Sequence, residues 1–553
     1  MTPRFLIDQG AATTSAALVT RLGGRWRLLA AQAFPATVEL DAVLDRVTER
    51  AMRALGGLAS EARSWGEWRS FERVLVASMP LRRITVLGAT ARRAADLAAA
   101  AEQAGWRVAA RMSPDRDDAV AIGAALAERT VDAVLLGGAD PPRSDERDTL
   151  ADLAAQAGAV VAQRPHLITI LSGAAAEQRD RFSFERVILA PPARPPEASA
   201  GGNDLTRILT ALGGQLDGPR FCAARAVGTL AELLEQTIEF VDVGVSAGAW
   251  FRATPPSPGE AGAGGDGSGA SSTNGRLQPG ASLEGFLISS GALVPDELDD
   301  DEAILDEVIA WSPLRLDRPT HRDRLRDLRT HPWWDAAGEG ALLRMAAVRA
   351  ALARLEAMRV RVGGSPPDRM PNADLLVIAG GAFAVAPGAA IALAAADTIR
   401  RPGLTRIAHD HATLLAPLGM LDDDERRELL SDLAADLLLP LGSMLIVAGG
   451  RPGREVGSLS VSSEWATPEV QPLSGGALRL IELPPGAHAT VDVQLRDGRL
   501  GQQRARAVVL EASGGLGGLL VDTRGVPMRL PQAGERRREV LAQWQHSLWP
   551  GAE

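Results

Sequence analysis

Near its start the chain reads "LIDQGAATTSAAL", from Leu6 to Leu18. Its apolar residues lead into Asp8, and Gly10 and the pair Thr13 and Thr14 follow. A strand that ends in Asp-x-Gly places a carboxylate beside exposed backbone amides, and glycine lets the chain turn close to a phosphate. A carboxylate at that point can hold Mg²⁺ directly or through water. The alternative is an ordinary strand-end turn, and this stretch alone does not decide between the two.

The composition of the chain excludes several classes of protein. Its 553 residues are 46% hydrophobic and 23% charged, as in a globular protein of several domains. All 59 positive charges are arginine, so a P-loop lysine, a Schiff base and a lysine general base are excluded. One cysteine, Cys222, excludes intrachain disulfides, Cys-rich zinc sites and iron–sulfur clusters. A net charge of −10 argues against nucleic acid and acidic membranes as partners.

The first part of the chain alternates the patterns of strands and helices. Apolar runs predict strands at 73–77, 84–88 and 131–136, and helical spacing predicts helices at 40–55, 91–104 and 146–157. Strands that are separated by helices favour an α/β layer with a largely parallel sheet. The sequence pattern changes after residue 441, where alternating apolar and polar residues and turns with Gly, Pro and Asp predict a small β domain.

A second strand of the same type occurs in "IEFVDVGVSAGAWF", from Ile238 to Phe251, where apolar residues lead into Asp242 and Gly244. Two such strands suggest an internal duplication. If they face each other across a cleft, they would clamp the phosphates of a nucleotide, and catalysis would consist of positioning and charge neutralisation. In "IAGGAF", the pair Gly380 and Gly381 precedes a helical pattern and would support the sugar and base of the nucleotide.

The longest apolar stretch, residues 375–396, is long enough for a membrane span to be considered. Its paired glycines, its alanine richness and Pro387 favour a strand, a tight turn and a buried helix instead. The apolar run at the N-terminus is too short for a signal peptide, and no cleavage pattern follows it. We therefore expect a cytoplasmic protein without a membrane span.

Two histidines near residue 410 form a weaker candidate site. His409 and His411 flank Asp410 in "AHDHA", and the three side chains would chelate a metal only if the backbone is extended there. On a helix, residues two apart point in different directions, so a shared metal site is not expected.

The order of these loops resembles that of the actin-like ATPase superfamily, which includes sugar kinases and Hsp70-type chaperones. More closely, the chain is similar to the MutL family associated with adenosylcobalamin-dependent glutamate mutase, which is unrelated to the mismatch-repair protein of that name. The matching segments include "LIDQGAATT", "DAVLLGGADPPRSDERDTLADLA", "FVDVGVSAGAW" and "LLVIAGGAFAVAP", and together they span roughly residues 5–421. The resemblance implies an α/β, actin-like (RNase H-like), two-lobed ATPase fold with an added C-terminal β domain.

The resemblance also implies a division of the chain and a set of site residues. The expected parts are a first lobe with both Asp-x-Gly strands (1–252), a flexible Gly/Ser/Pro-rich insertion (253–283), a second lobe with the adenosine-type loop (284–439), a C-terminal β domain (440–531) and a charged tail helix (532–553). The implied catalytic and metal-binding residues are Asp8 and Asp242, with ATP and Mg²⁺ as cofactors. The implied nucleotide-binding residues are Gly10, Thr13, Thr14, Gly244, Ser246, Gly380 and Gly381.

The second phosphate loop departs from the family pattern. It reads "GVSAGAW" and keeps Ser246 as its only hydroxyl, where the family usually has a hydroxyl pair. The first loop has Ser15 where a basic residue often follows, and the segment "ADPPRSD" carries two prolines, each of which lacks an amide donor. The phosphate loops are therefore diverged, and the sequence leaves open whether ATP is hydrolysed.

The resemblance implies an ATP-binding accessory protein that acts as a chaperone or reactivating factor for a cobalamin-dependent mutase subunit. Two alternatives stand beside it. One is a degenerate actin-like scaffold or protein-interaction module without nucleotide hydrolysis. The other is a small-molecule kinase on the same fold, which would need a substrate-positioning carboxylate that the sequence does not reveal.

Overall fold

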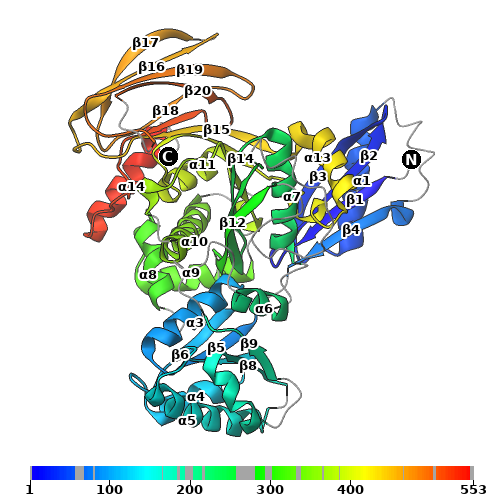
Figure 1. The fold of residues 1–553 in the computed structure, drawn as a ribbon. Coiled ribbons are helices and arrows are strands. Elements are labelled where there is room, and N and C mark those ends of the chain that lie inside the picture. Colours follow the sequence, from blue (N-terminus) through cyan, green and yellow to red (C-terminus); the bar gives the residue numbers. More distant parts are fainter. Residues whose placement is uncertain are drawn as a thin grey trace.

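The computed structural model has a mixed α/β fold, in which the described residues form four sheets. It describes residues 3–56, 68–78, 81–164, 166–182, 187–193, 204–213, 218–256, 281–292, 302–331, 338–363, 366–384, 386–464, 466–501 and 506–548. Figure 1 shows three outlying parts around a central sheet: a first sheet near the N-terminus, a parallel-sheet unit below, and a C-terminal sheet above.

The first sheet has the strand order β3-β2-β1-β4. Its strands are β1 (Arg4–Gln9), β2 (Thr13–Leu22), β3 (Arg25–Pro35) and β4 (Glu72–Ala77). The pairs β1–β2 and β2–β3 are antiparallel, whereas β4 pairs with β1 in parallel. Helix α1 (Leu40–Leu55), which agrees with the predicted helix over 40–55, packs against this sheet through Val43, Leu44 and Val47.

The central sheet repeats this arrangement and extends it. Its strand order is β12-β11-β10-β13-β14-β15-β21-β18. The strands are β10 (Ile238–Val243), β11 (Ala247–Thr254), β12 (Ser282–Ser290), β13 (Leu375–Ala379), β14 (Gly403–His409), β15 (Leu439–Ile446), β18 (Leu478–Ile481) and β21 (Leu519–Asp522). Strand β10 pairs antiparallel with β11 and parallel with β13, as β1 does with β2 and β4. The suggested internal duplication is therefore visible in the strand order, with the two Asp-x-Gly strands in equivalent places.

The sheet topology separates the two Asp-x-Gly strands, which the predicted first lobe (1–252) had put together. The predicted boundary at residues 252–253 falls inside β11, and β10 belongs to the sheet of β13. The reason is that β10 finds its parallel partner far along the chain, and local patterns do not encode that pairing. Residues 257–280 of the predicted insertion lie outside the described residues.

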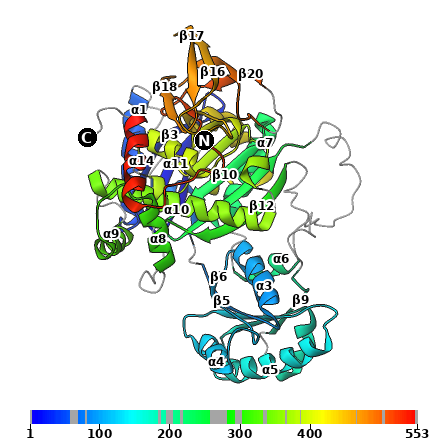
Figure 2. The same cartoon turned by 90° about the vertical axis from the view of Figure 1, so that its left-hand side faces the viewer.

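The described residues between 83 and 213 form a separate α/β unit at the bottom of Figures 1 and 2. Its parallel sheet has the order β6-β5-β7-β8-β9, as the alternation of strands and helices predicted. The strands are β5 (Arg83–Gly88), β6 (Arg107–Met112), β7 (Ala133–Gly137), β8 (Ile168–Ser172) and β9 (Val187–Ala190). Its helices are α3 (Ala91–Gln103), α4 (Ala119–Ala127), α5 (Ser144–Val161), η4 (Gly173–Arg181) and α6 (Asp204–Leu212).

The C-terminal region is β-rich, but it is divided between two sheets. Strands β16 (Glu455–Ser463), β17 (Ala466–Ser474), β19 (His488–Leu495) and β20 (Ala507–Ser513) form an antiparallel sheet of their own. Strands β15, β18 and β21 from the same region continue the central sheet, so the predicted boundary at residue 440 falls within β15. Helix α14 (Gly534–Leu548) lies in the predicted tail and packs near β18.

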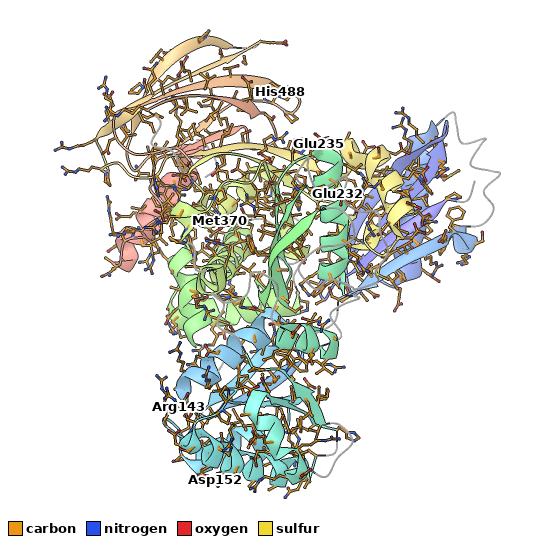
Figure 3. The ribbon with its side chains drawn as sticks, in the orientation of Figure 1. Arg143, Asp152, Glu232, Glu235, Met370 and His488 are labelled. Atoms are coloured by element: carbon orange, nitrogen blue, oxygen red, sulfur yellow. The ribbon has the colours of Figure 1, made fainter. Side chains whose placement is uncertain are left out.

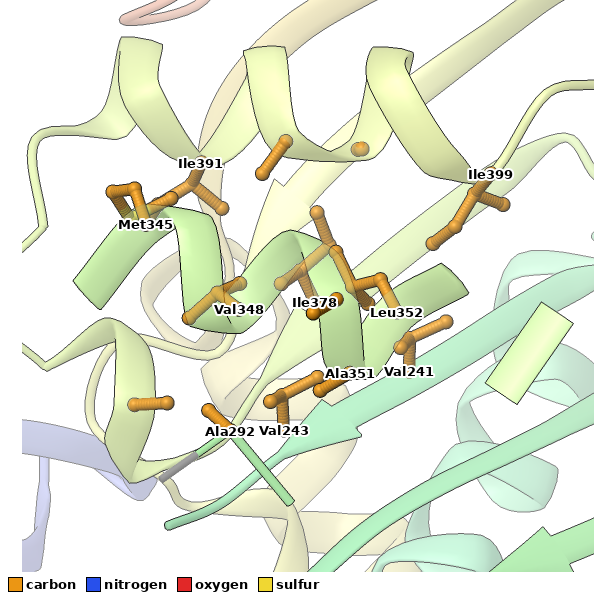
Figure 4. Packing of buried hydrophobic residues seen from close by; sticks show 14 of the residues in the cluster. Val241, Val243, Ala292, Met345, Val348, Ala351, Leu352, Ile378, Ile391 and Ile399 are labelled. Atoms are coloured by element: carbon orange, nitrogen blue, oxygen red, sulfur yellow. The ribbon is translucent and has the colours of Figure 1, made fainter. Parts of the chain in front are cut away.

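Two layers of helices cover the central sheet. On one face lie α8 (Glu302–Trp311), α9 (Arg318–Thr330), α10 (Gly338–Gly363) and α11 (Gly388–Thr398). Figure 4 shows Val348 and Leu352 of α10 and Ile391 of α11 packing against Val241 of β10 and Ile378 of β13. On the other face, α7 (Pro219–Leu234), α12 (Leu415–Leu418) and α13 (Asp423–Leu437) fill the space next to the first sheet.

Helix α7 joins the two related sheets through one hydrophobic core. Its buried residues Ala223 and Val227 share a cluster with Leu6 of β1 and Phe240 of β10. Figure 3 labels Glu232 and Glu235 at the C-terminal end of this helix, and Pro219 begins the helix at its opposite end.

The apolar stretch over residues 375–396 has the structure that its glycines and proline predicted. It forms β13, a short 3₁₀ turn over Gly381–Phe383, and α11, whose residues from Ile391 onward are buried. In the part of the chain that the structure describes, no helix is both long and apolar enough to cross a membrane.

Candidate functional site

The three predicted loops meet at one cavity between the first sheet and the central sheet. Eight of the nine predicted site residues line it: Asp8, Gly10, Thr13, Asp242, Gly244, Ser246, Gly380 and Gly381. The lining is completed by Ala11, Ala12, Ser15, Ser78, Pro219, Arg220, Val245 and Thr413. Segments that are far apart in the sequence thus converge on one cavity.

Both Asp-x-Gly turns are built in the same way. In the first, the Gly10 amide donates to the Thr13 carbonyl at 2.7 Å. In the second, the Gly244 amide donates to the Ala247 carbonyl at 2.9 Å. A Cβ atom on Gly10 or on Gly244 would lie 3.0 or 2.9 Å from those same carbonyl oxygens, so a side chain at either position would crowd the turn. Each aspartate is the last residue but one of its strand, just before a tight turn, and both turns line the cavity.

The third loop closes on the other two. A Cβ on Gly380 would lie 2.3 Å from Asp242 Oδ1, and one on Gly381 would lie 2.4 Å from Thr13 Oγ1. The loops are therefore in contact, and the cavity between them has a volume of about 50 Å³. Pockets for small molecules hold roughly 300–1,000 Å³. The cavity in this conformation is therefore too small for a ligand of that size.

Thr14 is the predicted site residue that does not line the cavity. Successive residues of a strand point to opposite faces, so Thr13 at the start of β2 faces the cavity and Thr14 does not. Its side chain is 1% exposed, and its hydroxyl makes no hydrogen bond within the described residues.

The site also contains a cation that the sequence analysis missed. Arg220, at the start of α7, lies with its Nε 3.7 Å from Asp242 Oδ2 and donates from Nη2 to the Ala247 carbonyl at 3.2 Å. The signal was present in "DGPRFCAARA", where Gly218 and Pro219 mark a helix start next to a basic residue. Arg220 lies outside the three predicted loops, so the local patterns gave no reason to place it in the same cavity.

Three aspartates share this region, and their pKa values are raised. Burial raises the pKa of Asp8 to about 7, and the charges of Asp242 and Asp410 add to the effect. Burial also raises the pKa of Asp242, and the positive charge of Arg220 opposes part of this rise. Burial raises the pKa of Asp410 to about 7, against two backbone amides that lower it. Burial is the largest cause at each of the three carboxyl groups, and a bound cation would offset it.

Asp410 supports the loop that carries Thr413. Its carboxylate accepts the amides of Leu414 at 2.9 Å and Leu415 at 3.2 Å, which caps the short helix α12. Thr413, which lines the cavity, has a φ of 51°, a strained conformation for a β-branched residue. Such strain at a site-lining residue is typical of functional loops.

The metal chelate considered for His409, Asp410 and His411 does not form. His409 ends β14 and His411 follows it, and both line a neighbouring cavity while Asp410 turns toward α12. The described residues contain no group of three or more His, Cys, Asp or Glu side chains that could hold a metal ion. Burial lowers the pKa of His409 to about 4, with a further contribution from the charge of His411.

This neighbouring cavity has a volume of about 360 Å³, which is enough for a small molecule. Residues 31–33 of β3 line one side, and Phe383, His409 and Leu439 line the other. Two segments contribute to both cavities: the turn at residues 380–384 and the loop at residues 411–413. Together they follow the boundary between the two related sheets.

Comparisons with known proteins leave the family of the chain open. No family model and no curated protein matches it. A nucleotide-free structure of acetone carboxylase, described as an ATP-dependent enzyme, aligns with 85% of this chain and 80% of its own at 10% identity and a TM-score of 0.28. The Ppx/GppA phosphatase of Aquifex aeolicus aligns with 79% of this chain and 91% of its own at 7% identity and a TM-score of 0.19. These scores are too low to establish a shared fold, and neither name points to the MutL family or to glutamate mutase.

Proposed function

We propose that this chain is a nucleotide-binding protein with the two-lobed, actin-like (RNase H-like) architecture. The observation that carries the proposal is the convergence of eight predicted residues from three distant segments on one cavity. The repeated strand order of the first and central sheets supports it independently. In this proposal the two Asp-x-Gly turns hold the phosphates of ATP, and the two sheets belong to the two lobes.

The donor set of the site fits Mg²⁺. Asp8 and Asp242 offer carboxylate oxygens, the ligand type that Mg²⁺ prefers. Asp8 Oδ1 is shielded from solvent and makes no hydrogen bond within the described residues. A bound cation would offset the burial that raises the pKa of both carboxyls, and it would relieve the repulsion from Asp242 and Asp410 that adds to the shift at Asp8. Mg²⁺ held here would neutralise phosphate charge, while Thr13 and the amides of the turns would position the phosphates.

The neighbouring cavity suits the rest of the nucleotide. Its volume of about 360 Å³ contrasts with about 50 Å³ at the Asp-x-Gly turns. Phe383 and His409 supply ring surfaces there, and the Gly380–Gly381 turn separates it from the carboxylates. The sugar and base would occupy this cavity, and the phosphates would reach the turns once the lobes open.

By its resemblance, the chain would act as a cytoplasmic, MutL-like accessory protein, a chaperone or reactivating factor for a cobalamin-dependent mutase subunit. Opening and closing of two lobes around a nucleotide is a suitable way to couple binding to a partner. A scaffold without hydrolysis is the second candidate. The observation that favours it is the ion pair of Arg220 with Asp242, which places a cation of the protein beside a predicted metal ligand.

Thermal unfolding with and without millimolar Mg-ATP tests the proposal. A ligand at 100 times its Kd adds about 2.7 kcal/mol of stability, which should shift at least one transition by a few degrees. Asp8→Asn and Asp242→Asn should lose the shift, while Asp492→Asn on β19, remote from the site, should keep it. A wild-type protein with no shift would reject nucleotide binding and favour the scaffold. A shift without ATP turnover would support binding without hydrolysis.

A further inference from the structure

Helix α7 begins in the wall of the cavity. Its first residues, Pro219 and Arg220, line the cavity together with both Asp-x-Gly turns. Gly218 stands at the N-cap and has no side chain to accept the amides of the first turn. A helix N-terminus carries a partial positive charge, so the end of this 16-residue helix favours an anion, although Pro219 at its first position has no N–H to donate.

The side chain of Arg220 provides a second and independent indication of a ligand. It is 5% exposed, yet its Nε and Nη1 make no hydrogen bond within the described residues. A guanidinium has five N–H donors in a planar fork, and a buried donor without an acceptor costs free energy. Its one hydrogen bond, to the Ala247 carbonyl at 3.2 Å, holds the group at the second Asp-x-Gly turn.

The charge balance of the cavity makes this cation important. Among the described residues that line the cavity, Arg220 is the one cation, and Asp8 and Asp242 are the acids. The chain has no lysine, so no lysine can approach a phosphate here. An arginine fork matches the geometry of a phosphate and binds it through two parallel hydrogen bonds.

We infer that Arg220 and the first turn of α7 form an anion site that binds the terminal phosphate of the nucleotide. This inference rests on the proposed function, and it assigns a phosphate-binding role to a residue outside all three loops. In the closed form the guanidinium faces Asp242. When a polyphosphate enters, Arg220 exchanges this carboxylate for phosphate oxygens, and Asp242 becomes free to face the metal ion.

Calorimetric titration of the full chain tests the inference, with Mg-pyrophosphate, Mg-ATP and adenosine as the probes. Arg220→Gln should bind Mg-pyrophosphate and Mg-ATP about 10- to 100-fold more weakly than the wild type, because a charge-assisted contact is lost. Adenosine should bind both proteins equally. Arg220→Lys, which keeps the charge without the fork, should recover part of the affinity. Arg225→Gln is the matched control, because Arg225 lies on the same helix but contacts Cys222 instead of the cavity.

The outcomes separate this inference from the proposed function. If pyrophosphate binds in an Arg220-dependent way and ATP binds no better, the anion site stands and the nucleotide site fails. If ATP binds with equal affinity to the wild type and to folded Arg220→Gln, the anion site is overturned and nucleotide binding stands. A wild type that binds neither anion overturns both. Should Arg220→Gln fail to fold, an unchanged affinity of Arg220→Lys for both anions would overturn the inference.

Discussion

Gly380 lies directly against Asp242: a Cβ atom at this glycine would be 2.3 Å from Asp242 Oδ1. Gly380 also has a φ of 112°, which L side chains rarely adopt. The turn after β13 therefore packs directly against the aspartate near the end of β10, with no room for a side chain between them. A glycine is required there both for the backbone conformation and for the space.

Gly380→Ala should therefore damage both stability and the site. We expect a loss of about 2–5 kcal/mol from the strained φ and the displaced neighbour together, and the thermal shift with Mg-ATP should disappear. Gly453→Ala is the matched control, since Gly453 has a φ of 75° but nothing within 4 Å of its would-be Cβ. Urea unfolding of both variants measures the difference. Equal losses in the two variants would show that the close contacts of Gly380 with Asp242 and with the Val243 carbonyl are unimportant.

Gly419→Ala tests how α7 is held in place. A Cβ on Gly419 would lie 1.7 Å from the Cys222 carbonyl, which is backbone and cannot rotate away. The φ of Gly419 is −70°, so alanine brings no conformational strain and the whole effect comes from the clash. We expect a loss of about 3 kcal/mol or more, measured by urea unfolding. A wild-type midpoint would contradict the close contact of α12 with α7.

Gly123→Ala should have the opposite effect on stability to Gly419→Ala in the same urea unfolding experiment. Gly123 lies inside α4, and nothing stands within 4 Å of its would-be Cβ. Alanine has the better helix propensity, so this substitution should stabilise the protein by about 0.5–1 kcal/mol. A glycine-to-alanine change thus gives opposite signs at the two positions, for reasons that the local geometry supplies.

The elements that the sequence predicted well are those whose signals are local. The apolar run before Asp8, the helical spacing over residues 40–55 and the glycines at 380–381 each act within a few residues, and the structure places them as expected. The convergence of the loops was predicted through a resemblance. The assignment of β10 to a different sheet from β1 was missed, because β10 pairs with β13, which lies more than a hundred residues later.

Arg220 shows a second limit of local patterns. Its position depends on the direction of α7, which is set by contacts such as that of Gly419 with Cys222, and these are tertiary. Thr14 shows a third limit of local patterns, because a Thr-Thr pair in the sequence does not reveal which of the two hydroxyls faces the cavity. The start of β2 at Thr13 decides it.

Asp522→Asn should unfold the C-terminal part of the central sheet at lower urea concentrations. The Asp522 carboxylate is fully buried and accepts Arg400 at 2.6 Å and Arg524 at 2.7 Å. Amide substitution leaves two buried guanidinium groups short of a negative charge, which costs roughly 3–5 kcal/mol. Glu455→Gln is the control, because it breaks an exposed ion pair with Arg496 that is worth roughly 1 kcal/mol or less. Equal midpoints for the two variants would contradict a structural role for the buried network.

His409 should make stability depend on pH. Burial, and then the charge of His411, lower the pKa of His409 to about 4 in the folded protein, whereas an unfolded histidine has a pKa near 6.5. Between these values the unfolded state binds the proton more tightly. The contribution of neutral His409 is therefore complete above about pH 6.5 and is lost as the pH falls toward 4. Its full size is about 3 kcal/mol at most.

The wild type and His409→Gln should be compared by urea unfolding at several pH values between 4.5 and 8. Asp8 and Asp410, whose pKa values are raised to about 7, titrate in the same range with the opposite sign, since their protonated forms are favoured in the fold. Their contributions cancel when the two proteins are subtracted at each pH. The difference should be constant above pH 7 and should move in favour of the variant as the pH falls. A difference that stays the same at every pH would contradict the lowered pKa of His409.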